Sequence, residues 1–249
     1  MTVKEFLDYV SQELNRSPRT VISYAEDLYA FEAYFLDKDE GLTWETIDTD
    51  IIRDWMESMV DKGNSPSSVA RRLSAVKGFF KFALAREFIS SDPAHAIRSP
   101  KRSRPLPQFL KENEINDLLD KQAWGDDFKG LRVRLIIMML YETGVRLAEL
   151  VGMDDKAVNL TGQFIKVTGK GDKQRVIPFG NELKSMIENY VEERNRTVSR
   201  KTAALLVSET GLRIKPDLVE RIVKENLARF CSLKKKSPHV LRHTFATAM

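Results

Sequence analysis

A short segment rich in proline and basic residues interrupts the chain near its hundredth residue. The stretch 99–107 contains Pro100, Pro105 and Pro107 together with three cations, and it has no periodic apolar positions. Proline disfavours helix at the preceding residue, so this segment is expected to run extended. At 249 residues the chain also exceeds the usual size of one domain. We therefore expect two domains, residues 1–98 and 108–249, joined by a linker over 99–107.

The first domain is predicted to be helical throughout, because apolar residues recur at helical spacing along it. A first helix is expected over 2–14. Two further helices begin with a serine N-cap followed by proline, at Ser17-Pro18 and Ser65-Pro66. Asp48 or Asp50 can cap the helix between them. A four-helix domain follows from these signals.

The second domain mixes helices with two short β-like runs. The runs 163–168 and 174–178 flank the turn at 169–173, whose glycines are typical of a hairpin. Helical patterns cover 110–120, 130–141, 145–151, 181–195, 216–230 and 238–249. The second of these is nearly all apolar and is expected to be buried. The predicted fold class is mainly α with a small antiparallel β-hairpin or sheet.

The composition indicates in which compartment the protein works more clearly than which reaction it performs. There are 40 Lys and Arg against 36 Asp and Glu, and the pI is near 9.0, which is compatible with a nucleic-acid partner. The single cysteine, Cys231, cannot form an intrachain disulfide. The longest apolar run, 135–140, is far too short to span a bilayer, and the N-terminus lacks a signal-peptide pattern. We expect a cytoplasmic protein that does not enter a membrane.

One candidate site lies where the apolar helix ends. Arg146 and Glu149 stand one helical turn apart, so the carboxylate can orient the guanidinium. An Arg-x-x-Glu pair by itself is usually a solvated helix pair. Here a buried helix and Gly144 lead directly into Arg146, which places the charge at the edge of a core.

The hairpin tip carries Lys170 between two glycines. A phosphate-binding P-loop is excluded, because Phe164 stands where that motif requires glycine and Gly171 replaces its Ser or Thr. What remains is a plain turn, or a lysine that can reach a neighbouring phosphate site.

A third cluster lies at the start of the last predicted helix. His239, Arg242 and His243 share one helix face. Zinc is not expected, because a catalytic zinc needs three protein ligands and Val240 stands where zinc proteases have Glu. A helix N-terminus favours an anion, so a phosphate site fits this cluster better. No metal and no other cofactor is expected.

Basic residues outside these clusters predict contacts with a nucleic-acid backbone. Any one of them would usually be a solvated charge, but together they bracket the linker and the phosphate-type cluster. The candidate DNA-binding residues are Arg71, Arg72, Lys77, Lys101, Arg102, Arg104, Lys173 and Arg175, with Lys234, Lys235 and Lys236 before the last helix.

These motifs, in this order, resemble the tyrosine recombinases of the phage-integrase family. The sequences of residues 142–146, 169–173 and 239–247 are similar to those of the chromosomal Xer branch of that family. The sequences of residues 17–36 and 65–84 resemble the core-binding domain of the same branch. The resemblance covers essentially the whole chain and implies a helical core-binding domain followed by an α-rich catalytic domain.

The resemblance also implies a reaction and its residues. A tyrosine hydroxyl attacks a DNA phosphodiester and forms a 3′-phosphotyrosine. Arg146 and Arg242 would bind the non-bridging oxygens of the phosphate. Lys170 would protonate the departing 5′-oxygen, and His239 would assist proton transfer. Glu149, together with His243, would support the local geometry. The implied partner is double-stranded DNA, bound by a homo- or hetero-tetramer of recombinases without a metal or nucleotide.

One departure from the family pattern concerns the nucleophile. The family places its tyrosine several helical turns after the His-x-x-Arg motif, whereas all six tyrosines here precede His239. We therefore expect a chain that is incomplete at its C-terminus and that binds DNA without cleaving it. Two alternatives remain open, a non-catalytic module that occupies recombination sites and a mobile-element integrase. The sequence does not choose between chromosome dimer resolution, which would serve chromosome partition and cell division, and element integration.

Overall fold

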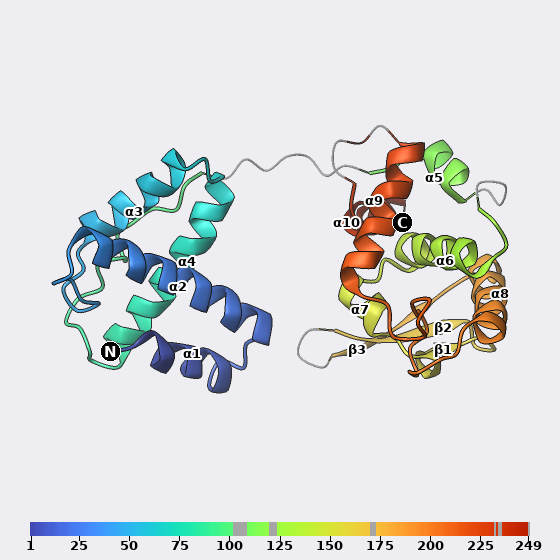
Figure 1. The fold of residues 1–249 in the computed structure, drawn as a ribbon, viewed down its shortest axis with the longest axis horizontal. Helices are drawn as coiled ribbons and strands as arrows, with labels where there is room; N and C mark the ends of the chain where they lie inside the picture. Colours follow the sequence, from blue (N-terminus) through green and yellow to red (C-terminus); the bar gives the residue numbers. More distant parts are fainter. Residues whose placement is uncertain (102–108, 120–123, 170–172, 232, 234–235, 249) are drawn as a thin grey trace. The chain divides into compact units, whose positions relative to one another are not determined.

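The computed structural model describes residues 1–249 except 102–108, 120–123, 170–172, 232, 234–235 and 249, and it describes no side chains for 112 and 246–248. The chain divides into two compact units, Met1–Arg104 (unit 1) and Pro105–Met249 (unit 2). Figure 1 labels their helices and strands. Within the described residues no helix is both long enough and apolar enough to cross a membrane.

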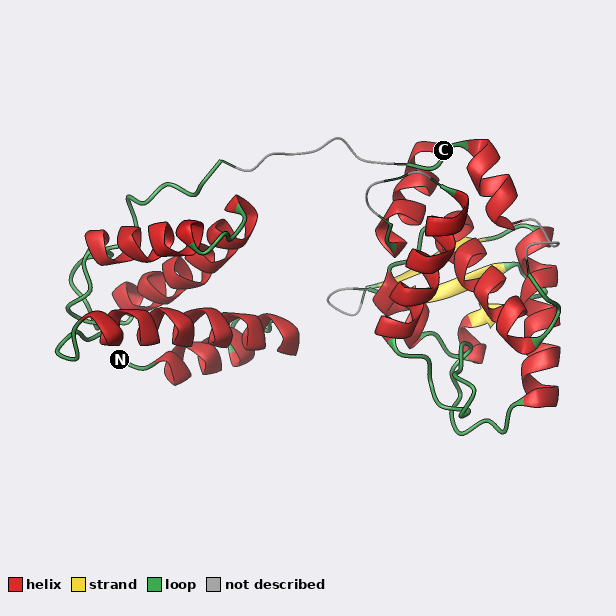
Figure 2. Cartoon of the chain, turned by 45° about the horizontal axis from the view of Figure 1, so that its top comes forward, coloured by secondary structure: helices red, strands yellow, loops and turns green. Residues whose placement is uncertain are grey.

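The described residues of unit 1 form helices joined by loops, with no strand among them (Figure 2). Its helices are α1 (Val3–Gln12), α2 (Pro18–Lys38), α3 (Thr49–Asp61) and α4 (Pro66–Ala85). The predicted serine caps are confirmed, because Ser17 accepts a hydrogen bond from the backbone N–H of Thr20 (3.3 Å) and Ser65 accepts one from Ser68 (3.2 Å). Of the two candidate aspartates, Asp48 caps α3.

The core of unit 1 is aromatic and gathers around α4. Phe79 and Phe80 are fully buried there, and Trp44 packs on Phe79 with ring centroids 4.2 Å apart. Phe6 of α1 packs perpendicular to Phe79, with ring centroids 5.6 Å apart. These contacts pack α1 and the α2–α3 connection against α4 and contribute to the stability of unit 1.

Unit 2 combines six helices with a small sheet within its described residues. Its elements are α5 (Glu112–Leu119), α6 (Phe128–Thr143), α7 (Leu147–Gly152), the 3-10 turn η2 (Asp155–Ala157), β1 (Val158–Asn159), β2 (Phe164–Thr168), β3 (Gln174–Pro178), α8 (Asn181–Thr197), α9 (Pro216–Phe230) and α10 (Pro238–Ala248). The predicted hairpin is confirmed as β2 and β3, which pair antiparallel with Val167 opposite Arg175. The two-residue strand β1 was not predicted, because two residues carry no periodic signal.

Helix α6 is the centre of unit 2, as its apolar sequence predicted. Leu135 to Leu140 are all buried, and α8, α9 and α10 pack against the helix. Its last turn ends at Gly144, and α7 starts three residues later. The prediction of helix from residue 145 is therefore wrong at its start. Gly144 adopts a left-handed backbone (φ 56°) and Arg146 an extended one, so the chain turns sharply between the two helices.

Candidate functional site

The turn between α6 and α7 brings the last helix of unit 2 close to its backbone. At Gly144 a β-carbon would lie 2.5 Å from Cδ1 of Phe245 on α10, so only glycine fits this contact. The Gly144 carbonyl also accepts a hydrogen bond from the Arg242 guanidinium. The same turn therefore ends α6, seats α10 and holds Arg242.

Glu149 organises the cations beside this turn. Its side chain is only 5% exposed and accepts hydrogen bonds from Arg146 Nη1 (2.9 Å) and from the Arg146 backbone N–H (2.8 Å). Arg175 on β3 donates to both carboxylate oxygens at 2.7 Å. Burial by itself raises the pKa of this carboxyl, but the hydrogen bonds from Arg175 and Arg146 outweigh it and lower the pKa to about 2. Glu149 is thus ionised throughout the physiological range.

Helix α10 is anchored so that its first turns face the α6–α7 turn. Val240 and Leu241 are buried on one side of the helix. Thr244 accepts a hydrogen bond from the backbone N–H of Leu110 (3.0 Å), which ties the helix to the beginning of unit 2. His239 and Arg242 lie on the remaining face and line a cavity.

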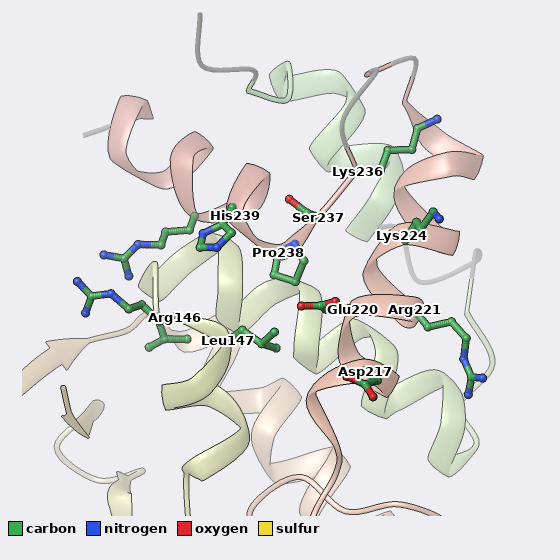
Figure 3. Close-up of a pocket in the computed structure, with 12 residues that line it drawn as sticks. Arg146, Leu147, Asp217, Glu220, Arg221, Lys224, Lys236, Ser237, Pro238 and His239 are labelled. Carbon is green, nitrogen blue, oxygen red and sulfur yellow. The ribbon is translucent and has the colours of Figure 1, made fainter. Parts of the chain in front are cut away.

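This cavity, of about 410 Å³, opens between three elements (Figure 3). The turn before α7 and the start of α10 contribute one side, and α9 contributes the other. Its lining residues are Val145, Arg146, Leu147, Asp217, Glu220, Arg221, Lys224, Lys236, Ser237, Pro238, His239 and Arg242. Figure 3 shows Arg146 and His239 on the side opposite the charged residues of α9.

The cavity concentrates positive charge. Burial lowers the pKa of Arg242, and the neighbouring charges of Arg146 and Arg175 lower it further, whereas Glu149 opposes the shift. Three guanidinium groups and one carboxylate therefore act on one another at this place. Arg242 has no carboxylate within ion-pair distance among the described side chains, so its charge is left for a ligand. A phosphate is one of the anions whose geometry planar guanidinium donors match with paired hydrogen bonds.

The structure brings four of the predicted residues to one cavity. Arg146, Lys236, His239 and Arg242 line the cavity, and Glu149 is hydrogen-bonded to Arg146. His243 is exposed on α10 and is not among the lining residues. Predictions for Lys170, Arg102, Arg104, Lys234 and Lys235 concern positions outside the described residues.

The predicted DNA-binding cations of unit 1 make contacts within that unit. Arg71 forms a two-pronged ion pair with the buried Asp27, and Arg72 lies 3.8 Å from the same carboxylate. Lys77 donates to the carbonyl of Ile97.

The other described candidates differ in whether their side chains are exposed or held in an ion pair. Lys101 is exposed, and so is Lys173, whose backbone carbonyl accepts from Gly169 N–H (2.8 Å) and closes the hairpin. Arg175 is the exception, because Glu149 holds its guanidinium.

Sequence reasoning missed the contribution of α9 to the cavity. Arg221 and Lys224 stand one turn apart on this helix, a spacing shared by many solvated surface pairs. Asp217 and Glu220 are interspersed with them and cancel part of their charge. No local signal distinguishes this face from an ordinary amphipathic helix, so only its packing beside α10 reveals it. Among the described residues no group of three or more His, Cys, Asp or Glu side chains could hold a metal ion.

Two family models match separate parts of the chain. Residues 108–249 match the model of the phage integrase family, and residues 3–87 match that of the phage integrase N-terminal SAM-like domain. Tyrosine recombinase XerC of Chlorobaculum tepidum is 33% identical over 98% of this chain and 81% of its own length. Tyrosine recombinase XerC of Natranaerobius thermophilus is 35% identical over 98% of this chain and 83% of its own.

Two solved structures illustrate the likeness of fold. The crystal structure of XerA recombinase is 26% identical, with a TM-score of 0.51 over 99% of this chain and 82% of that one. The structure of XerH site-specific recombinase bound to a palindromic difH substrate has a TM-score of 0.77 at 21% identity, over 99% of this chain and 73% of that one.

Proposed function

The chain belongs to the phage integrase family and is a Xer-like tyrosine recombinase, and from this premise we propose that the cavity at the start of α10 binds the phosphodiester that is cut in duplex DNA. The observation that carries the proposal is the convergence on one cavity of Arg146 and Arg242, which lie 96 positions apart in the sequence. Converging guanidinium groups match the charge that gathers on the non-bridging oxygens in the transition state.

The proposed reaction exchanges one phosphodiester for another. A tyrosine oxygen attacks phosphorus and loses its proton, the bond from phosphorus to the 5′-oxygen breaks, and the 5′-oxygen leaves as a hydroxyl. Arg146 and Arg242 donate to the non-bridging oxygens, and His239 assists proton transfer at the phosphate. Lys170 supplies the proton to the leaving oxygen. The phosphotyrosine conserves the energy of the broken bond, so the reverse attack by a 5′-hydroxyl reseals the strand.

The proposed division of labour follows the two expected domains. Residues 1–98 would act as a core-binding domain and residues 108–249 as the catalytic domain, joined by the basic linker 99–107. Both would contact one duplex in the cytoplasm, and four recombinases, identical or of two kinds, would assemble on the recombination site. The similarity to XerC relatives favours chromosome dimer resolution over element integration.

The attacking tyrosine is proposed to come from outside residues 1–249, from a further segment or a second recombinase. Four of the six tyrosines lie on α1 and α2 of unit 1. Tyr141 is half-buried on α6 and packs against the core. Tyr190 is buried, and its hydroxyl accepts a hydrogen bond from the Val207 backbone N–H (3.2 Å). None of the six lines the cavity.

The test is covalent trapping on a nicked suicide substrate, in which the cleaved end diffuses away and the protein–DNA adduct accumulates. We expect an adduct from the full-length protein. Arg242→Lys keeps the positive charge but loses the planar donor fork, so the adduct should form roughly 100-fold more slowly while DNA affinity changes little. An adduct that forms equally fast with Arg242→Lys would remove Arg242 from the site. DNA binding without any adduct would instead support the non-catalytic alternative.

A further inference from the structure

The side chain of Arg175 lies on the face of the β2–β3 hairpin that packs against the rest of unit 2. It stands opposite Val167 in the β2–β3 register, and residues that face each other across two strands point to the same side of a sheet. Val167 is 3% exposed, so this side is the interior one. The adjacent residues of β3, Gln174 and Val176, are exposed on the other side. A cation that contacts DNA freely would be expected on the exposed face.

The carboxylate that Arg175 meets is already shared with Arg146. Oε1 of Glu149 accepts from Nη1 of both arginines, at 2.9 Å from Arg146 and 2.7 Å from Arg175. Oε2 accepts from the Arg146 backbone N–H at 2.8 Å and from Arg175 Nη2 at 2.7 Å. Two carboxylate oxygens offer about four acceptor sites, so all are occupied. Glu149 cannot rotate without losing a bond to one of the arginines.

We infer that Arg175 is a positioning residue for the phosphate chemistry: through Glu149 it fixes the direction of the Arg146 guanidinium and fastens the β2–β3 hairpin to the cavity. The inference rests on the proposed function. Arg146 is 55% exposed on its side chain and would otherwise sample many rotamers. The two-pronged bond from Arg175 locks the carboxylate plane, and the locked carboxylate restrains Arg146.

Arg175 has a second effect that depends on charge alone. Arg146, Arg175, Arg242 and Glu149 together carry a formal charge of +2, to which Arg175 contributes one unit. A lysine at position 175 would preserve this charge. It would present a single point charge in place of the planar fork, so it could not hold both oxygens of Glu149 in one plane. Arg175→Lys therefore separates positioning from electrostatics.

The experiment compares Arg175→Lys with wild type in the full-length protein. Adduct formation on the suicide substrate is measured in a single turnover at saturating DNA, and DNA affinity is measured against salt. We expect the rate constant to fall about 10- to 100-fold, because small misplacements of a catalytic group have effects of this size. Affinity should stay within about threefold, and the salt slope should be unchanged, because no phosphate contact is lost.

Two control variants separate positioning from a general loss of stability. Arg196→Lys breaks a comparable two-pronged pair with Glu193 (2.8 and 2.9 Å) on the exposed face of α8 and should leave the rate constant unchanged. Val167→Ala loosens the same hairpin without touching Glu149. If Val167→Ala slows cleavage as much as Arg175→Lys for an equal loss in melting temperature, Arg175 is merely structural and the inference is wrong.

A double variant tests the pathway through Glu149. If Arg175 acts by way of this carboxylate, Glu149→Gln combined with Arg175→Lys should be no slower than the slower single variant. If the rate reductions of the two single variants multiply in the double variant, the two residues act separately. Wild type without an adduct would refute the proposed function, whereas an active wild type with an equally active Arg175→Lys would refute only the positioning role.

Discussion

Replacing Gly144 with alanine tests how the end of α6 seats the last helix. Gly144 has φ 56°, a backbone conformation that costs a residue with a β-carbon ~1–2 kcal/mol. The new β-carbon would also lie 2.5 Å from Cδ1 and 2.9 Å from Cε1 of Phe245, whereas ordinary contacts begin near 3.4 Å. Overpacking of this kind costs a further ~1–3 kcal/mol. The variant should therefore lose roughly 2–5 kcal/mol of folding free energy, the sum of the two effects.

The assay is thermal unfolding followed by circular dichroism, read on the transition of unit 2. A domain of this size loses ~2–4 °C per kcal/mol, so a loss of ~2–5 kcal/mol should lower the melting temperature of unit 2 by roughly 4–20 °C. Two other glycines separate the contributions. Gly63→Ala has the positive φ (78°) but no atom within 4 Å of the new β-carbon, so unit 1 should lose only ~1–2 kcal/mol. Gly152→Ala, with neither feature, should be neutral or slightly stabilising.

A double variant decides whether Phe245 causes the extra loss. Phe245→Ala opens a cavity and destabilises unit 2 by itself, but it removes the ring that the β-carbon introduced by Gly144→Ala would strike. Gly144→Ala and Phe245→Ala should therefore be less than additive by ~1 kcal/mol or more. The reasoning is refuted if the two effects add, or if Gly144→Ala costs no more than Gly63→Ala.

Three further expectations concern DNA binding, acid stability and the nucleophile. Gel-shift affinity for duplex DNA should fall steeply between low and physiological salt, because bound cations release condensed counterions, and a flat response would contradict the proposal that both domains contact the duplex. Because the pKa of Glu149 is lowered to about 2, its ion pairs stabilise the fold fully above the ordinary value of 4.5 and lose this contribution as pH falls from there through 2. The urea midpoint of Glu149→Gln should accordingly decline less than that of wild type between pH 5 and pH 3; equal declines would refute the assignment. Residues 1–249 alone should bind DNA and form no adduct, and an adduct abolished by Tyr141→Phe would place the nucleophile on α6.

Much of the architecture was predictable because its signals are local. Ser17, Asp48 and Ser65 begin helices through hydrogen bonds to residues two or three positions away. The apolar run of α6 required burial on every side, and the glycines between the two β-like runs predicted that β2 and β3 pair as a hairpin. Arg146, His239 and Arg242 could be named as candidates because their motifs are contiguous in the sequence and resemble a known family.

Other features depended on distant parts of the chain. A sequence pattern could pair Arg146 with Glu149, but Arg175 looked like one more exposed cation on a hairpin. Its true partner is 26 positions away along the chain, and only the strand register turns its side chain inward. The α9 side of the cavity was unpredictable for the same reason. A charged helix face becomes part of a cavity only through the element that packs beside it, which the local sequence does not specify.

The sequence by itself determined most of the helices, the β2–β3 hairpin and which residue types are available for phosphate chemistry. Those properties follow from interactions within a few residues. Only the tertiary structure decided that the carbonyl of Gly144 holds Arg242, that Phe245 requires a glycine at that position and that one buried carboxylate serves two arginines. Such contacts form only when α6, α10 and the hairpin are packed together, because short-range polar interactions depend on distances that no local pattern encodes.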